Sequence, residues 1–292
     1  MKNNIMIMNF SGVYEMQGLK TALEKKVDSV VAEAENMAAK PVITQLDFQD
    51  IPGTNCYCDS LAEEEIGKRI IPFGPEGLHF LDSGNYHYLT KLWLELVKEP
   101  FELLVFDHHT DMQCPAFGGI LSCGGWIREA LETNDNLKHV ILVGPPQALN
   151  YRWSPVLPRQ RCLAEDGEEL LGKVTWISEE EFLQNVEKPN WIQKLCGQCN
   201  VTGAEADEKE QLPLYISIDK DILSESEGKT NWDQGNVVLD QVLQFIDVYM
   251  QQTPGRQFIG MDICGEDPEA DNEEVQTVCR KTSEKICGFF LC

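Results

Sequence analysis

The sequence has 292 residues, 42% hydrophobic and 25% charged, which is typical of a globular chain with one large α/β domain or two small ones. Its formal net charge of −24 argues against a nucleic-acid partner held by its phosphates, whereas such a charge would attract a cationic ligand. No run of about 18 apolar residues is present and residues 1–15 lack the pattern of a cleavable signal peptide, so we expect no membrane span and a cytoplasmic location.

Short, nearly continuous apolar segments alternate along the chain with amphipathic segments. The apolar segments are typical of strands buried on both faces, and their alternation with helices indicates right-handed crossovers between parallel strands. We predict strands at residues 5–10, 78–81, 103–106, 140–143, 174–177, 214–218 and 258–263. We predict helices at residues 62–71, 86–97, 120–131, 179–186, 238–250 and 271–287. With the polar stretch 200–211 taken as a surface loop, the prediction is one domain over residues 1–292.

The 11 cysteines are expected to be reduced thiols, because the chain shows no export signal. The pairs Cys56/Cys58 and Cys196/Cys199 could each bind a metal ion, and the second could also be a redox pair. Neither has a second pair at the spacing of a zinc finger, so ordinary thiols remain the expectation.

Three side chains that can bind metal follow the predicted strand at residues 103–106. Asp107, His109 and Asp111 are two apart, so in an extended chain they lie on one face, whereas His108 lies on the other. Burying these carboxylates is costly unless a cation neutralises them. On its own, such a segment could also be a polar loop after a strand.

The predicted strand at residues 214–218 ends in the same way, in Asp219 and Asp221. Ligands of open parallel sheets bind at the carboxyl ends of strands, where both segments fall. Two divalent cations would balance the four carboxylates, and a carboxylate and imidazole set suits manganese, magnesium or iron better than structural zinc. Two such cations about 3.5–4 Å apart share a water and lower its pKa. The two segments together predict a dinuclear metal centre.

These segments resemble those of the ureohydrolase superfamily, which includes arginases, agmatinases and formiminoglutamases and carries D-x-H-x-D and S-x-D-x-D at strand ends. The family has a further histidine ligand in a G-G-D-H-like turn, and His87 after Gly84 matches it. The resemblance implies an α/β fold, a three-layer α/β/α sandwich around a mainly parallel sheet of about eight strands.

The resemblance also implies a ligand assignment. His87 and Asp111 would bind one ion, His109 and Asp221 the other, and Asp107 and Asp219 would bridge two divalent ions, with Mn²⁺ expected. The bridging hydroxide would attack a guanidinium or amidine carbon, with Asp111 as the partner for its proton.

Two departures from the family pattern concern catalysis and substrate binding. The family's proton-shuttle histidine has no counterpart in residues 113–129. His108 and Cys123 are the candidates to carry the proton in its place. The family's D-I-x-E-x-N-P has a glutamate for the guanidinium, whereas here Gly265 stands in that place and Glu266 follows. A shift by one residue reverses the facing of a strand residue, although a bulge could restore it, so Glu266 is a candidate substrate ligand.

Some aromatic and histidine residues have no clear family counterpart. Trp126 and Trp232 could line a pocket, although packing is the commoner role of tryptophan. His79 falls in the predicted strand at residues 78–81 and could support the site, although core packing is the expectation, and His139 opens the predicted strand at residues 140–143 and is expected to be structural.

The leading functional prediction is a metal-dependent hydrolase of a non-peptide C–N bond in a small, linear and cationic guanidino or amidine compound. One alternative is a single-metal amide hydrolase like the histone-deacetylase branch of the same fold. The other is a former enzyme that keeps its metal without catalysis. Relatives often form ring-shaped oligomers, so a homo-oligomer is one expectation.

Overall fold

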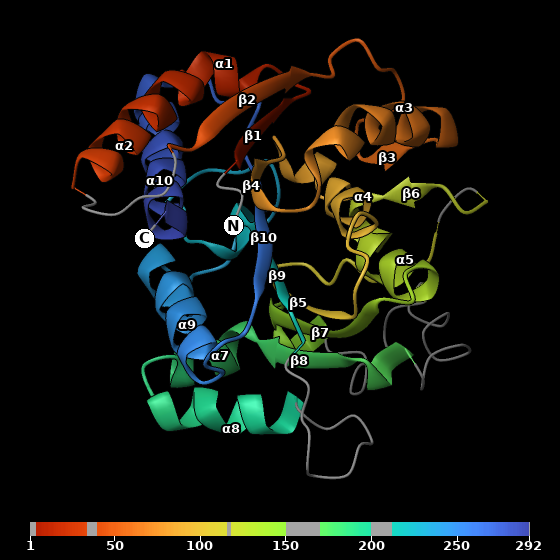
Figure 1. The fold of residues 1–292 in the computed structure, drawn as a ribbon, viewed down its shortest axis with the longest axis vertical. Helices are drawn as coiled ribbons and strands as arrows, with labels where there is room; N and C mark the ends of the chain where they lie inside the picture. The colour runs from red at the N-terminus through yellow and green to blue at the C-terminus, as the bar shows by residue number, and fades with distance from the viewer. Residues whose placement is uncertain (1–3, 34–39, 116–117, 150–169, 200–211, 292) are drawn as a thin grey trace.

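A computed structural model describes residues 4–33, 40–115, 118–149, 170–199 and 212–291 (Figure 1). Its central feature is an eight-stranded, fully parallel sheet in the order β2-β1-β4-β10-β9-β5-β7-β8. The strands are β1 (Asn4–Asn9), β2 (Val42–Asp47), β4 (Gly77–Phe80), β5 (Phe101–Phe106), β7 (Leu137–Gly144), β8 (Val174–Ser178), β9 (Leu214–Asp219) and β10 (Phe258–Cys264). The predicted α/β class and the sheet of about eight strands are confirmed.

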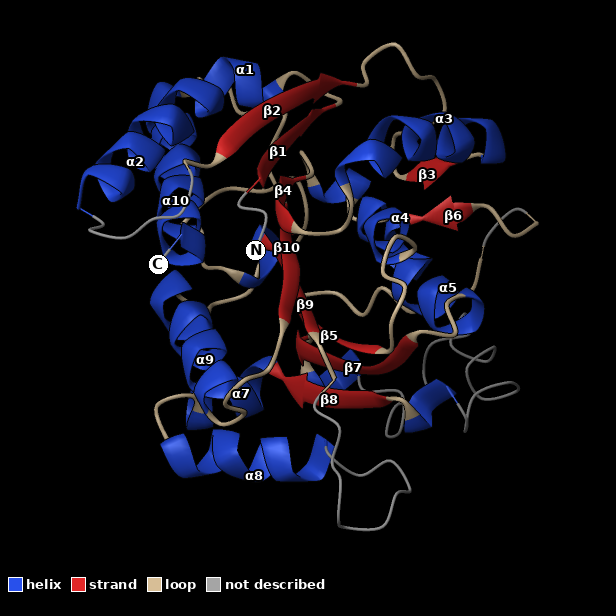
Figure 2. Ribbon diagram, in the orientation of Figure 1, coloured by secondary structure: helices blue, strands red, loops and turns tan. Residues whose placement is uncertain are grey.

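Helices cover both faces of the sheet, which Figure 2 shows edge-on as the middle of three layers. One face carries α1 (Val13–Gln17), α2 (Leu19–Glu33), α7 (Glu179–Asn185), α8 (Pro189–Cys199), α9 (Leu239–Gln251) and α10 (Glu273–Leu291). The other carries α3 (Ser60–Ile70), α4 (Leu89–Leu94), α5 (Trp126–Thr133) and the antiparallel pair of β3 (Tyr57–Cys58) and β6 (Leu121–Ser122). Short 3₁₀ turns are η1 (Ile71–Phe73), η2 (Gly84–Tyr86), η3 (Cys123–Gly125), η4 (Gln147–Leu149) and η6 (Lys220–Ile222).

Each face of the sheet has its own hydrophobic core. In β5, Leu103 and Val105 belong to the core under α3–α5, and Leu104 and Phe106 belong to the opposite core. Because both sets are fully buried, residues 103–106 of the strand are apolar at every position, which is the pattern that the sequence showed. Burial of each large aliphatic or aromatic side chain contributes about 1.5–3 kcal/mol.

Strand β2 and helix α2 are among the elements of the fold that were not predicted. Strand β2 lies at the edge of the sheet and is partly exposed along its length, so it lacks a continuous apolar run. Helix α2 buries Leu19, Leu23 and Val27, whose spacing of four is a helical stripe that was present in the sequence. The predicted helices at 86–97 and 120–131 are shorter than expected, because each begins with a 3₁₀ turn or short strand.

A buried ionic network ties the amino-terminal end of β5 to its neighbours. Glu102 accepts hydrogen bonds from Tyr249 at 2.6 Å and Arg256 at 2.8 Å, and its other oxygen is 2.9 Å from His139 Nδ1. Burial raises the pKa of Glu102, but the His139 hydrogen bond and the Arg256 charge outweigh it and lower the pKa below its ordinary value. His139 thus lies at the opposite end of the sheet from the carboxyl ends of the strands.

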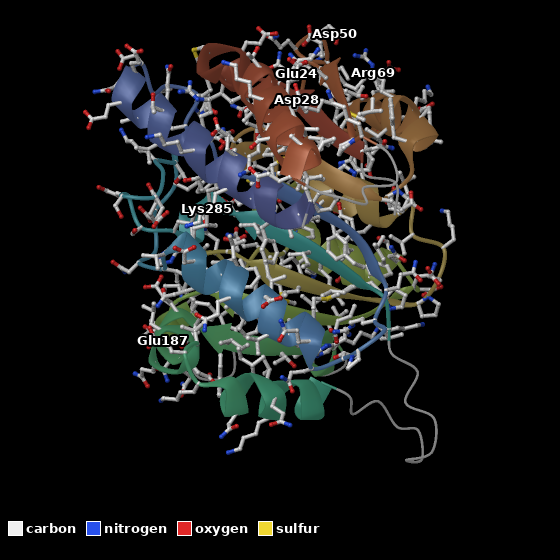
Figure 3. All side chains as sticks on the ribbon, turned by 60° about the vertical axis from the view of Figure 1, so that its left-hand side comes forward. Glu24, Asp28, Asp50, Arg69, Glu187 and Lys285 are labelled. Atoms are coloured by element: carbon white, nitrogen blue, oxygen red, sulfur yellow. The ribbon has the colours of Figure 1, made fainter. Side chains whose placement is uncertain are left out.

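Acidic side chains lie on the outer faces of several helices. Figure 3 shows Glu24 and Asp28 on α2 and Glu187 after α7 directed outward, with Lys285 on α10 as one of the scattered cations. Among the described residues, none of the helices has the length and apolar character of a membrane span. The surface therefore carries the negative field that the composition predicted.

Candidate metal centre

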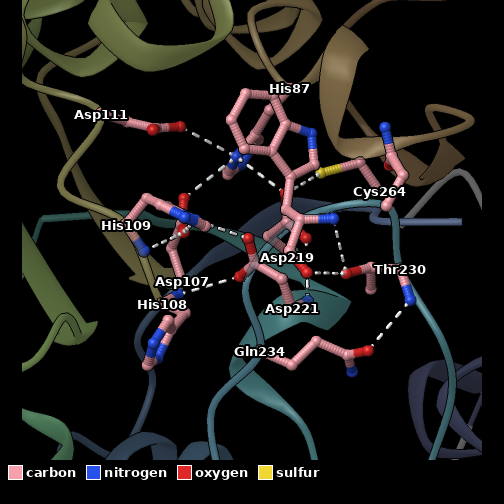
Figure 4. A network of polar contacts seen from close by, with 12 residues as sticks. His87, Asp107, His108, His109, Asp111, Asp219, Asp221, Thr230, Gln234 and Cys264 are labelled. Carbon is pink, nitrogen blue, oxygen red and sulfur yellow. Dashed lines mark hydrogen bonds and ion pairs between the residues drawn. The ribbon is translucent and has the colours of Figure 1, made fainter. Parts of the chain in front are cut away.

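The six predicted metal ligands converge above the carboxyl ends of neighbouring strands (Figure 4). β5 and β9 are adjacent in the sheet, and both end in the carboxylate segments. A third segment reaches the same place after β4, through the turn η2. The side chains brought together are His87, Asp107, His109, Asp111, Asp219 and Asp221.

The first half of the cluster is centred on His87, which is 1% exposed. Its Nδ1 lies 3.2 Å from Asp107 Oδ2, 3.1 Å from Asp111 Oδ2 and 3.4 Å from Asp219 Oδ2. Ligand atoms about 2.1 Å from an octahedral cation are about 3.0 Å apart along an edge. The ligand atoms of His87, Asp107 and Asp111 also lie within 4.8 Å of one another, so their spacing fits ligands around one cation.

The hydrogen bonds of His87 determine which ring nitrogen carries the proton and which one directs its lone pair at the carboxylates. Ser217 Oγ donates its proton to Asp262 Oδ1 at 2.6 Å, so it accepts from His87 Nε2 at 2.9 Å. In the neutral ring, Nδ1 then has no proton and points at three carboxylates. Among the described residues, neither His87 Nδ1 nor Asp107 Oδ2 has a hydrogen-bond partner although both are buried. A buried lone pair beside an unpaired carboxylate oxygen fits a bound cation.

The second half of the cluster consists of Asp107, His109 and Asp221. His109 Nδ1 lies 2.7 Å from Asp221 Oδ2 and 3.5 Å from Asp107 Oδ1. Backbone amides orient the carboxylates: His109 N donates to Asp107 Oδ1 at 2.6 Å, His108 N to Asp221 Oδ1 at 2.9 Å and Asp221 N to Asp219 Oδ1 at 2.9 Å. Asp107 is common to both halves, which suits a carboxylate placed between two cations.

Burial and mutual repulsion make the carboxylate cluster costly without cations. Burial and the Asp107 charge raise the pKa of Asp111 to about 7, and burial with the Asp219 charge raises the pKa of Asp221 well above its usual range. Burial raises the pKa of Asp107, but the neighbouring His109 and His87 outweigh it and lower the pKa below its ordinary value. Burial lowers the pKa of His109, but Asp107 and Asp221 outweigh it and raise the pKa to about 12. Without cations, some of these buried carboxylates would have to bind protons, whereas divalent cations would neutralise their charge instead.

Asp111 is held in an uncommon conformation by Trp126. Its φ of 46° is in the left-handed region, and Trp126 Nε1 donates to Asp111 Oδ2 at 2.6 Å. Trp126 is fully buried, so it positions this carboxylate from behind and does not line the cavity.

A cavity of about 290 Å³ opens above the cluster. Its floor includes Asp107, His109, Asp111, Asp219 and Asp221, and its walls include Cys56, Tyr57, Gln113, Cys123 and Trp232. Trp232 stands edge-to-face with His109, with 5.5 Å between ring centroids. Among the described residues, those that line the cavity include neither lysine nor arginine. Of the two tryptophans that the sequence offered as pocket residues, Trp232 lies in the wall of the cavity.

Of the two candidate proton carriers, His108 and Cys123, only Cys123 lines the cavity. His108 turns away from the cavity, with Nδ1 3.2 Å from Glu179 Oε2. Cys123 lies in the wall beside Cys56, a residue that the sequence argument passed over as an ordinary thiol. A hydrogen bond from Cys123 lowers the pKa of Cys56 to about 7, whereas this bond and burial raise the pKa of Cys123. Cys196 and Cys199 belong to α8, and their side chains lie outside the described residues.

The structure does not bring Glu266 to the cavity. Glu266 is fully buried, forms an ion pair with Lys220 and accepts from Gln17 Nε2 at 2.8 Å. Gly265 precedes it with φ 95°, and a Cβ there would overlap Asp219 Oδ1 and lie 2.7 Å from Lys220 N. The position of the family's guanidinium-binding acid is thus closed to any side chain, and Glu266 faces the other way.

A cysteine that the sequence argument did not single out joins the cluster instead. Cys264 at the end of β10 is fully buried, and its thiol donates to Asp219 Oδ2 at 3.0 Å. Strand alternation places it on the same face as Asp262, and adjacent pairing aligns it with Asp219. The pairing of β10 with β9 brings Cys264 to the cluster, and neither strand's sequence alone indicates that the two strands are neighbours.

Comparison with known proteins gives one relative by sequence. No family model matches the chain. An uncharacterized protein of Thermotoga maritima is 30% identical over 263 residues, covering 90% of this chain and 80% of that protein.

Solved structures share the fold over 99% of this chain at low sequence identity. Formimidoylglutamase from Bacillus subtilis has a TM-score of 0.66 and 16% identity, with 86% of its chain covered. Trypanosoma cruzi formiminoglutamase, solved with Mn²⁺, has a TM-score of 0.63 and 12% identity, with 93% covered. Arginase from Bacillus caldovelox has a TM-score of 0.63 and 11% identity, with 99% covered. These similarities confirm the predicted three-layer fold.

Proposed function

Because this chain belongs to the same family as the uncharacterized Thermotoga maritima protein and has the fold of the ureohydrolase superfamily, we propose that it is a dinuclear metal-dependent hydrolase. Its reaction would be cleavage of a non-peptide C–N bond in a small guanidino or amidine compound. The observation that carries the proposal is the convergence of six ligand side chains, with unpaired His87 Nδ1 and Asp107 Oδ2, below a cavity.

The proposed ligand assignment follows the two halves of the cluster. His87 and Asp111 would hold the first ion and His109 and Asp221 the second, and Asp107 and Asp219 would be shared by the two. Carboxylate and imidazole donors suit Mn²⁺, the ion present in the T. cruzi formiminoglutamase structure.

The chemistry divides between the ions and the side chains of the cavity. When bound, a pair of divalent cations would supply a water of lowered pKa and an electrophilic contact for the substrate. Asp111 lines the cavity and accepts a hydrogen bond from Trp126, which supports a role for it as the acceptor of the proton of the attacking water. Cys56 would be the better carrier of that proton to solvent, because it is partly exposed in the cavity wall and the neighbouring Cys123 lowers its pKa to about 7.

The lining of the cavity favours a small cationic substrate. A volume of about 290 Å³ is at the lower end for ligand pockets, so the substrate must be small. Trp232 and Tyr57 line the cavity with aromatic rings, which can bind a cation, and no lysine or arginine lines the described part of the cavity to bind an anion. With Gly265 in place of the family's acid, these aromatic rings and the floor carboxylates would replace the usual guanidinium ligand.

A single-metal amide hydrolase, like the deacetylase branch of the fold, is less well supported. Such a site needs one ion with an Asp, a His and a later Asp. Here a second set of donor atoms, His87 with Asp107 and Asp111, lies beside the first. The extra set has no role in a single-metal mechanism.

The proposal is tested by product analysis on the metal-loaded protein. Guanidino, amidine, formimino and acetylated amine compounds are incubated with the Mn²⁺-loaded wild type and with Asp107→Asn. The expected result is release of urea, ammonia or formamide by the wild type and its loss in Asp107→Asn. Acetate release alone would instead support the deacetylase-like alternative, and no release despite full metal loading would support a former enzyme.

A further inference from the structure

We propose that the Cys264 thiolate is a seventh protein ligand of the centre and binds the ion held by His87. The inference rests on the proposed metal centre and adds a sulfur donor to a set of oxygen and nitrogen donors. It also means that the two ions would occupy chemically different positions.

The geometry places Cys264 at the edge of the first half of the cluster. Its Sγ lies 3.0 Å from Asp219 Oδ2, and its Sγ and the ligand atoms of His87 and Asp219 are all within 4.8 Å of one another. A sulfur about 2.3 Å and an oxygen about 2.1 Å from one cation lie about 3.1 Å apart at a right angle. The observed separation therefore matches two ligands of one ion as well as it matches a hydrogen bond.

An independent observation supports an ion-binding position at this point. His87 is 1% exposed, and its Nδ1 faces Asp219 Oδ2 at 3.4 Å without a hydrogen-bond partner among the described residues. Cys264 is the thiol that approaches this atom, and it is fully buried behind the floor of the cavity. Its position behind the floor suits a ligand, whereas a nucleophile would have to reach the substrate.

The binding step conserves charge and protons. The S–H bond of Cys264 breaks as the bond from sulfur to the ion forms, and the proton passes to Asp219 Oδ2, its present acceptor. Asp219 lines the cavity, from which the proton leaves to solvent. No oxidant or reductant is required.

A thiolate changes the metal preference of one position. Soft sulfur favours zinc, iron(II) and cobalt(II) over manganese, whereas the second position has only carboxylate and imidazole donors. The structure thus points to a mixed centre, with the softer ion beside Cys264 and His87.

Cobalt(II) reports sulfur ligation directly, because thiolate-to-cobalt charge transfer gives an intense near-ultraviolet absorption. The full chain is loaded with Co²⁺, and bound cobalt is counted beside the spectrum for wild type, Cys264→Ser, Cys264→Ala and Cys287→Ser. Cys287 is an equally buried thiol on α10, outside the cluster, and serves as the matched control.

The expected result is a charge-transfer band in the wild type and in Cys287→Ser that is lost in both Cys264 variants. We also expect Cys264→Ser to weaken Zn²⁺ binding by about tenfold or more and Mn²⁺ binding by less. Two cobalt ions per chain without the band, or a band that survives in the Cys264 variants, would overturn the ligand assignment and leave the dinuclear centre intact. A wild type that binds no cobalt would overturn both.

Discussion

Replacing Glu266 by glutamine is expected to destabilise the fold strongly, because it leaves a buried lysine without its counter-ion. Lys220 is 1% exposed, and besides Glu266 it donates to Ser283 Oγ at 2.7 Å and to the Cys279 carbonyl at 3.3 Å. Glutamine keeps the volume and can still accept from Gln17, so the change removes mainly the charge.

The magnitude follows from the burial of the pair. Removing one partner of a buried ion pair costs about 3–5 kcal/mol. The two neutral acceptors that remain for Lys220 place the expected loss at the lower end, about 3 kcal/mol. For a chain of this size that corresponds to about 6 °C in the unfolding midpoint.

The assay is urea unfolding of the protein in EDTA, so that metal binding does not contribute to the measured free energy. The double variant Glu266→Leu with Lys220→Met is expected to recover most of the loss, because an apolar pair needs no counter-ion. Asp240→Asn, which breaks the exposed pair with Lys285 at 2.6 Å, is the control and should stay within about 1 kcal/mol of the wild type.

Two results would refute this reasoning. A Glu266→Gln variant as stable as the wild type would mean that the ion pair does not hold the fold. If that variant kept its stability but bound substrate weakly, Glu266 would be the substrate ligand that the sequence suggested. A double variant as unstable as the single one would mean that packing, and not the unpaired charge, sets the cost.

Three further substitutions test the surroundings of the centre and the fold. Ser217→Ala removes the acceptor of His87 Nε2 and should weaken metal binding by about 10- to 100-fold in a chelator competition; unchanged affinity would contradict the assigned tautomer. Gly265→Ala should cost at least about 2 kcal/mol and lower metal content, because its Cβ would overlap Asp219 Oδ1; full metal content would contradict this. Glu102→Gln should cost about 3 kcal/mol at neutral pH, since it unpairs a buried charge. Because the pKa of Glu102 is lower in the folded state, its contribution to the free energy of unfolding is fully present above the unfolded pKa of about 4.3 and is lost as the pH falls through the folded pKa. The stability difference between wild type and Glu102→Gln should therefore shrink on acidification. A difference that grew on acidification would contradict this reasoning.

The central strands and the convergence of the ligands could be predicted from the sequence. β5 and β9 are buried on both faces, so their continuous apolar runs end visibly where Asp107 and Asp219 begin. The spacing of two residues placed Asp107, His109 and Asp111 on one side and His108 on the other, and the structure keeps that division. These features depend on periodicity along one segment, which a sequence shows directly.

The remaining features depend on contacts between segments. Cys264 reaches Asp219 because β10 pairs with β9, and the sequence does not state which strands are neighbours. Glu266 faces Lys220 because the backbone at Gly265 has a positive φ, so its direction could not be counted from strand alternation. Cys56 enters the cavity wall through the pairing of β3 with β6, two strands of two residues each that carry no periodic signal.

The most direct test of the account is the metal content per chain of protein purified with added Mn²⁺, beside Asp107→Ala. Asp107 is common to both halves of the cluster, so its loss should affect both ions together. We predict two ions per chain in the wild type and a sharp fall in the variant. One ion per chain in the wild type would contradict the dinuclear centre, and none would mean that the carboxylate clusters are structural.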